Sequence, residues 1–177
     1  MKTTLDEIRK HNPCAGGWEK LLKYLGKTKA DDEPLAITTI LDSNGLQDAL
    51  WCLRAVEGYD REIRLYAVWC ARQVQHLLKD QRSIDAIDVA EKYANGQATQ
   101  DELDAARDDA WSAAGAARYA AMDVAWSAAW HAADAAARVA AWGAVRAARE
   151  GVVWWDDAYV AAKANQEAEL RRICGEG

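Results

Sequence analysis

Ser127, His131 and Asp134 place three residue types of nucleophilic catalysis on one stripe of a predicted helix, at spacings of four and three residues. A hydrolase built on them would also need a pocket and amide donors for an oxyanion. Amides inside a helix already donate to carbonyl groups one turn away, so they cannot serve as those donors. We therefore interpret the stripe as a solvated face with local hydrogen bonds, and a hydrolase as the weaker alternative.

His11 and Cys14 form the only pair of metal-ligand types at short spacing, and no second pair accompanies them. Cys52, Cys70 and His76 are spread along predicted helices, where a buried cysteine acts as a small hydrophobic residue. The chain contains neither a GxGxxG nor a GxxxxGK[ST] phosphate-binding loop. We expect no metal, no cofactor and no enzymatic activity.

Three acidic stretches are candidate contacts for a protein partner. The stretch after Thr99 lies at a predicted helix N-terminus, where acids interact favourably with the helix dipole. That role needs fewer acids than this stretch contains. A patch of this charge would dock on a basic surface of another protein. The predicted contact residues are Asp31, Asp32 and Glu33 in a surface loop, Asp101, Glu102, Asp104, Asp108 and Asp109 after Thr99, and Trp154, Trp155, Asp156 and Asp157.

In the third stretch, the pair Trp154-Trp155 leads into Asp156-Asp157, which we expect to cap a final helix that ends near Ile173. Two adjacent tryptophans cannot both face the same interior side of a helix, so one would stay exposed as an anchor for a partner. In a bent segment both indoles could instead pack inside. The sequence leaves these two interpretations open.

The composition is typical of one globular helical domain. The 177 residues are 51% hydrophobic and 28% charged, with two prolines and no phenylalanine. The net charge is −6, of which residues 1–98 carry −1 and residues 99–177 carry −5. Because binding to phosphate groups requires a basic face, we expect no direct contact with nucleic acid.

The sequence also bears on the cellular compartment. No apolar run reaches the roughly 18 residues that a membrane span requires. The first residues, MKTTLDEIRK, lack the apolar core of a signal peptide, and the four cysteines show no CxxC spacing. We therefore expect free thiols, no membrane contact and a location in the reducing cytoplasm.

Capping signals and apolar spacing divide residues 1–98 into short helices. Residues 27–34 are expected as a surface loop, and ITTIL at 37–41 as either a helical turn or a short extended piece. No stretch shows the period-two alternation of a strand. The expected N-caps are Thr4, one residue of Asp42-Ser43-Asn44-Gly45, Asp60, Ser83 and Thr99, and the expected stops are Asn12-Pro13, Gly26, Gly58 and Asn95-Gly96.

Residues 99–150 are rich in alanine, with a few tryptophans at helical spacing. Trp111, Trp126 and Trp130 share one arc of a helical wheel beside the polar stripe, so this segment is expected to pack on two faces. As a single helix it would extend about 78 Å, whereas a compact domain of this size has a radius of gyration of about 16 Å. We expect a break within 115–122 that gives an antiparallel pair, or else a projecting helix that dimerises.

The predicted fold class is therefore all-α. We expect a compact helical bundle with a long Ala/Trp-rich helix or an antiparallel helix pair in the C-terminal half. Residues 1–177 form one domain in this prediction, with an N-terminal helical half at 1–98 and an alanine-rich helical half at 99–177.

Three segments resemble a family of all-helical immunity proteins encoded by bacteria, phages and prophages. They are LDSNGLQDALWCLRAVEGYDREIRLYAVWCARQVQHLLKDQRSIDAIDVAEKYANGQAT, DELDAARDDAW and QEAELRRIC. The resemblance covers about residues 35–174, and its most specific part runs from Asp42 to Thr99. It implies a protein that binds and blocks another protein, and it brings no catalytic residues.

We accordingly expect a non-enzymatic inhibitor that occludes a partner protein with a basic surface. The partner would be a toxin or, for a phage-encoded chain, a bacterial defence effector such as a CRISPR complex. The alternative is a homodimer or larger homo-oligomer assembled through the alanine-rich helix faces.

Overall fold

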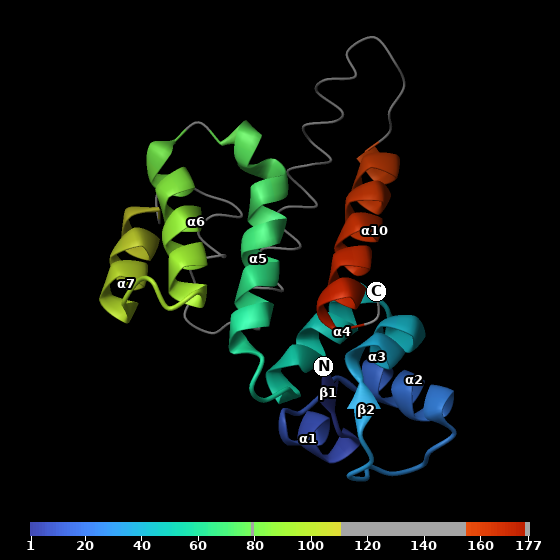
Figure 1. The fold of residues 1–177 in the computed structure, drawn as a ribbon. Helices are drawn as coiled ribbons and strands as arrows, with labels where there is room; N and C mark the ends of the chain where they lie inside the picture. Colours follow the sequence, from blue (N-terminus) through green and yellow to red (C-terminus); the bar gives the residue numbers. More distant parts are fainter. Residues whose placement is uncertain (79, 111–154, 176–177) are drawn as a thin grey trace.

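Eight α-helices are present in the computed structural model, which describes residues 1–78, 80–110 and 155–175 (Figure 1). The 3-10 turns η1 (Leu53–Ala55) and η2 (Gln75–Leu77) follow the fourth and fifth of them. The all-α class predicted from the sequence is confirmed. The helices are α1 (Leu5–Lys10), α2 (Ala15–Leu25), α3 (Ile37–Asn44), α4 (Leu46–Cys52), α5 (Asp60–Val74), α6 (Gln81–Ala94), α7 (Gln100–Asp109) and α10 (Trp155–Ile173).

Some predictions fall on residues that the structure does not describe. These are the alanine-rich helix or helix pair with its break at 115–122, and the polar stripe of Ser127, His131 and Asp134. The hydrolase and the homo-oligomer assembled through alanine-rich faces both depend on residues in this segment, so they stay predictions.

Three capping signals read from the sequence are confirmed. The Thr4 side chain accepts a hydrogen bond from the Glu7 amide, which starts α1. Gly26 ends α2 with a left-handed φ of 66°, which glycine adopts without steric cost. Thr99 and Glu102 form a reciprocal capping box at the start of α7. Each of these signals depends only on residues within one helical turn.

The predicted caps of α5 and α6 are wrong. Asp60 is the first residue of α5, and Tyr59 holds the N-cap position. Ser83 lies inside α6 and is buried, whereas Asp80 caps that helix by accepting from the Arg82 amide at 3.0 Å. In both cases the helix starts earlier than the sequence indicated, and helix boundaries are less sharply encoded in local sequence than the helices themselves.

The undecided ITTIL segment is helical, as the first part of α3. Its apolar residues Ile37 and Ile40 are fully buried, so core packing outweighs the low helix propensity of the two threonines. The helix continues through Asp42-Ser43-Asn44, and Gly45, with a φ of 93°, separates it from α4. Gly45 is therefore the capping residue among the four candidates.

A short antiparallel ladder, absent from the prediction, joins β1 (Lys2–Thr3) to β2 (Leu35–Ala36). Lys2 pairs with Ala36 and Thr3 with Leu35. Strands of two residues are too short for the alternation that identifies a strand in sequence. The ladder fixes the first residues beside the start of α3, and the amide of Ile37 donates to the Met1 carbonyl at 3.2 Å.

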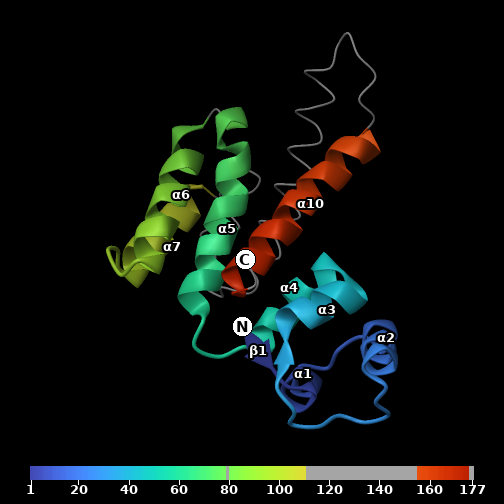
Figure 2. The ribbon, with the colours of Figure 1, turned by 45° about the vertical axis from the view of Figure 1, so that its right-hand side comes forward.

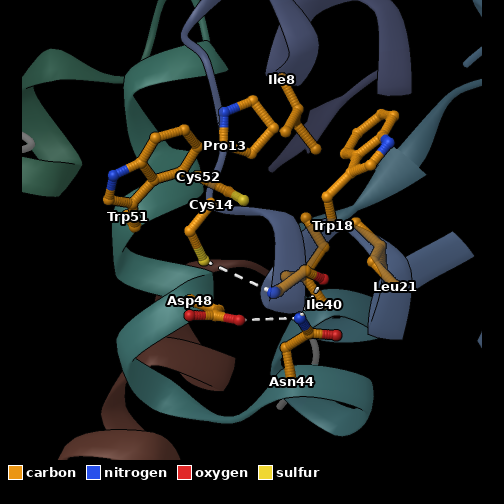
Figure 3. Close-up of a pocket in the computed structure, with 11 residues that line it drawn as sticks. Ile8, Pro13, Cys14, Trp18, Leu21, Ile40, Asn44, Asp48, Trp51 and Cys52 are labelled. Atoms are coloured by element: carbon orange, nitrogen blue, oxygen red, sulfur yellow. Dashed lines mark hydrogen bonds between the residues drawn. The ribbon is translucent and has the colours of Figure 1, made fainter.

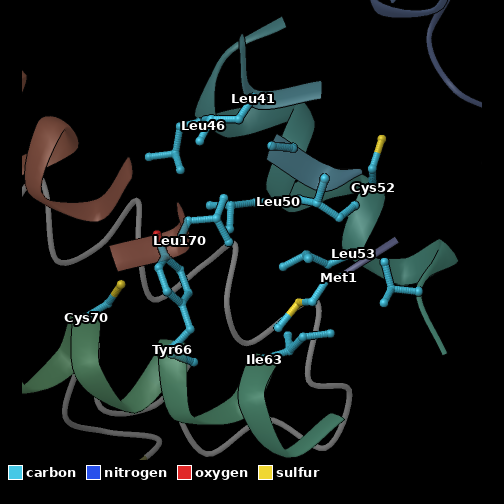
Figure 4. Packing of buried hydrophobic residues seen from close by; sticks show 14 of the residues in the cluster. Met1, Leu41, Leu46, Leu50, Cys52, Leu53, Ile63, Tyr66, Cys70 and Leu170 are labelled. Atoms are coloured by element: carbon cyan, nitrogen blue, oxygen red, sulfur yellow. The ribbon is translucent and has the colours of Figure 1, made fainter. Parts of the chain in front are cut away.

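Helix α10 contributes the last part of the hydrophobic core. It passes between α5 on one side and the α3–α4 pair on the other (Figures 1 and 2). Its Leu170 is fully buried against a cluster that includes Tyr66 and Leu50 (Figure 4). The Tyr66 hydroxyl donates to the backbone carbonyl of Gln166 at 3.3 Å, which satisfies the polar end of a buried ring. Helices α5, α6 and α7 pack on one another in sequence order beyond this core.

This packing predicts that Leu170→Ala lowers the free energy of unfolding by about 2–5 kcal/mol, because it opens a cavity where α10 meets the core. Val160, on the same helix, is 64% exposed, so Val160→Ala should change the value by less than about 0.5 kcal/mol. Urea unfolding followed by circular dichroism measures both variants. Similar small effects of the two substitutions would show that α10 does not depend on this contact.

Candidate functional site

Helix α7 presents most of the predicted acidic patch on one exposed face. Leu103 and Ala110 on its opposite side are fully buried, where α7 packs on α6. We call the outer surface the α7 acidic face, and it consists of Asp101, Glu102, Asp108 and Asp109, which are exposed, and Asp104, which is half-buried.

Three members of the α7 acidic face also have local structural roles. Glu102 accepts from the Thr99 amide and hydroxyl, and these hydrogen bonds lower the pKa of its carboxyl group. Arg107 lies 3.2 Å from an Asp104 oxygen and 3.5 Å from an Asp108 oxygen. Glu102 and Asp109 lie beside Lys92 and Arg82 of α6. The five acids thus outnumber the three neighbouring cations, and the face keeps a negative field.

A groove of about 400 Å³ runs between α6 and α7 beside this face. Its apolar lining includes Val89 and Ala86 of α6 and Ala105 and Ala106 of α7. Arg82 from α6 and Asp109 from α7 lie among its charged lining residues, so charges of both signs border the groove. Asp101, Asp104 and Asp108 are not part of this lining and point along the outer side of α7.

The predicted contacts in the loop Asp31-Asp32-Glu33 are partly neutralised by a lysine. The Nζ atom of Lys27 lies 2.6 Å from Asp31 and 2.7 Å from Glu33. The hydrogen bond from Lys27 is the main cause that lowers the pKa of the Asp31 carboxyl group. The Asp6 amide donates to the Asp31 carbonyl at 3.0 Å, so this loop is fixed to α1. Asp32 remains exposed.

The third predicted stretch is described only in part. Trp154 lies outside the described residues, and α10 begins at Trp155. Asp156 and Asp157 therefore fall in the first turn of α10 rather than before it, which corrects the predicted cap. The predicted end of this helix at Ile173 is confirmed.

The structure does not bring the three acidic stretches together. Figure 1 shows α7 at one edge of the molecule, the loop between α2 and β2 at the opposite end, and the start of α10 at a third position. Of the three stretches, the α7 acidic face has the most acids.

A pocket that the sequence did not predict lies between α2 and α4 (Figure 3). Its volume is about 190 Å³, and its walls are mainly apolar. Trp18 and Trp51 stand on opposite sides of it in Figure 3. We call it the α2–α4 pocket, and its lining residues are Ile8, Pro13, Cys14, Gly17, Trp18, Leu21, Ile40, Asn44, Asp48, Trp51 and Cys52.

One wall of the α2–α4 pocket is polar. The Asn44 side-chain amide donates to Asp48 Oδ2 at 2.7 Å and to the Gly17 carbonyl at 2.8 Å. It therefore joins α3, α4 and α2 at one point. Cys14 caps α2, and its Sγ accepts from the Gly17 amide at 3.4 Å. The approach is close, since a Cβ atom on Gly17 would lie 2.8 Å from Asp48 Oδ2.

No sequence signal identified this pocket because its walls come from separate helices. The sequence presents Asn44 only as a capping candidate. The spacing of Asn44 and Asp48 places them on one helical face, but the pattern does not show that α2 lies opposite.

The buried cysteines behave as predicted. Cys52 and Cys70 are buried free thiols, and desolvation is the main cause that raises the pKa of each to about 12. Cys14 is a free thiol but exposed. Within the described ranges no three His, Cys, Asp or Glu side chains gather as a metal site requires.

No family model, curated protein or solved structure matches the chain. Among the helices that the structure describes, none is both long enough and apolar enough to span a bilayer. The α7 acidic face and the α2–α4 pocket are the candidate binding features of the described residues.

The close contact at Gly17 predicts opposite effects of two neighbouring substitutions. A Cβ atom on Gly16 meets nothing within 4 Å, so Gly16→Ala should stabilise the fold by about 0.5 kcal/mol through the unfolded chain. Gly17→Ala should destabilise it by about 1 kcal/mol, because the Asp48 carboxylate must shift. Urea unfolding of both variants gives the comparison. Equal stabilisation by the two alanines would contradict the contact.

The ion pair of Lys27 predicts that Asp31 titrates below the ordinary value of 3.8. Since the pKa of Asp31 is lower in the folded than in the unfolded chain, the pair stabilises the fold near neutral pH. This contribution disappears as the pH falls through the folded pKa. NMR titration of the carboxyl carbon should show the pKa rising in Lys27→Met and changing less in the control Lys29→Met. An unchanged pKa in Lys27→Met would contradict the assignment.

Proposed function

We propose that this protein is a non-enzymatic inhibitor of the immunity type, which binds another protein and covers its working surface. The α7 acidic face carries the proposal, because it groups five acids on a helix whose inner side is buried. Three of them lie on the outer side of α7, and Glu102 and Asp109 border the groove beside α6. Binding of the partner protein would take place in the cytoplasm.

The acids of α7 lie close enough to act as one charged surface. Ten residues of helix extend about 15 Å, and electrostatic screening at physiological salt has a length of about 8 Å. A basic surface approaching α7 therefore meets their summed field. Such fields raise association rates and reject like-charged partners more than they raise affinity. The face thus favours a basic protein and disfavours nucleic acid.

Helix α7 also supports this surface rigidly. The capping box of Thr99 and Glu102 fixes its first turn, and Leu103 and Ala110 anchor it to α6. A preordered surface loses little conformational entropy when it binds. This supports binding by occlusion, in which the helix covers a partner surface without rearranging.

The chemistry of the partner follows from the same charge. A basic surface that normally holds nucleic acid would match the α7 acidic face. The resemblance to immunity proteins supports a toxin or a bacterial defence effector, such as a CRISPR complex, as that partner. A second copy of this chain is a poor occupant of the face, because two faces of like charge repel each other.

Charge reversal at the end of α7 tests the proposal. Asp108→Lys with Asp109→Lys should reduce the association rate with a captured partner by about tenfold or more and weaken its dependence on salt. The fold should survive, since lysine in the last turn of a helix interacts favourably with the helix dipole. The partner is recovered from host cytoplasm, identified by mass spectrometry and studied by surface plasmon resonance at several salt concentrations.

The matched control is Glu19→Lys with Glu57→Lys, which makes the same change of charge at exposed sites outside α7. If both double variants lose affinity equally, only the net charge matters and the α7 acidic face is not the contact. An unchanged rate in the α7 variant, or recovery of no protein partner, would also refute the proposal.

A further inference from the structure

We infer that the α2–α4 pocket receives an arginine side chain of the partner protein, with the guanidinium beside Asp48 and between the indoles of Trp18 and Trp51. The inference rests on the proposed function only in taking a protein as the ligand. The pocket lies in the helices before α5, away from the α7 acidic face (Figure 2).

The size of the pocket selects a side chain rather than a cofactor. Pockets for drug-sized ligands measure about 300–1,000 Å³, whereas this pocket measures about 190 Å³. An apolar cavity of about 150 Å³ already accommodates a benzene molecule. One long side chain from another protein therefore fits the available space.

The charge of the pocket selects a cation. Asp48 is half-buried, and its Oδ2 accepts from the Asn44 amide, which fixes the carboxylate but does not neutralise it. A carboxylate offers about four acceptor positions, so most of them stay open. In the described part of the chain, no lysine, arginine or histidine pairs with Asp48. A partly buried carboxylate in an apolar pocket is best satisfied by a charged donor from outside.

The walls favour arginine over lysine. A guanidinium group is planar, weakly hydrated and able to stack on an aromatic ring, and its fork of donors matches a carboxylate. Its three methylene groups would lie along the apolar lining. The chain uses the same contact internally, since the Arg54 guanidinium lies 3.9 Å from the ring centroid of Trp51. Arg54 is not among the residues that line the pocket.

The test uses N-acetyl-arginine methylamide as the probe and the citrulline analogue as its neutral isostere. Titration into the ¹⁵N-labelled full chain is followed by NMR at the indole N–H signals of Trp18 and Trp51. The arginine probe should shift both signals, and citrulline should bind at least about tenfold more weakly, because it lacks the charge-assisted hydrogen bond. The lysine probe should also bind more weakly than arginine.

Two pairs of variants locate the site. Asp48→Asn should weaken binding of the arginine probe about tenfold, whereas Asp60→Asn, also an acid in the first turn of a helix, should leave it unchanged. Gly17→Ala should weaken it by displacing the Asp48 carboxylate, and Gly16→Ala should not. Thermal unfolding shows whether each variant is folded.

Equal binding of arginine and citrulline, tighter binding of lysine, or the absence of shifts at Trp18 and Trp51 would each overturn the inference. The α7 double variant should bind the probe as the wild-type chain does. The two proposals can therefore fail separately, because the probe requires the pocket alone and the captured partner reports on α7.

Discussion

The burial of α10 against α5 on one side and against α3 and α4 on the other is the central packing contact of the described structure. Tyr66 on α5 and Leu170 on α10 are both fully buried, and α10 also contacts α3 and α4. The Met1 amino group donates to the Cys174 carbonyl at 3.0 Å, which ties the first residues to the end of the same helix. The ion pair between Arg171 and Asp42 is exposed and adds little by comparison.

Both proposed contact surfaces are consequences of this packing. Helix α7 is the last of the series α5, α6 and α7. Among the described helices its main contact is α6, and its acids lie on the side away from the buried Leu103. At Gly17 the α2 backbone approaches the Asp48 side chain of α4 closely, while the half-buried indoles of Trp18 and Trp51 extend from the same two helices. A glycine beside large indole side chains leaves a space between the helices, which is the α2–α4 pocket.

The two surfaces share a sign of charge but act over different distances. The α7 acidic face is exposed, so its influence reaches about one screening length and affects mainly the encounter. Asp48 lies partly inside an apolar pocket, where water is displaced and a single contact is stronger. A basic partner would therefore be attracted by the first surface and held in register by the second, provided that its own charges span both.

Features that depend on residues within one or two helical turns could be predicted from the sequence. The helical class, the caps at Thr4 and Thr99, the stop at Gly26 and the acids of α7 follow from local spacing, because the helix places nearby residues on known faces. The continuation of α3 through Asn44, by contrast, depends on core packing that the local sequence does not specify.

The pairing of the two short strands and the formation of the α2–α4 pocket also depend on tertiary contacts. The Asn44 amide that shapes the pocket bonds to Gly17, 27 residues earlier, and to Asp48. Such contacts depend on which helices meet in space. No periodic pattern within a single helix encodes that meeting.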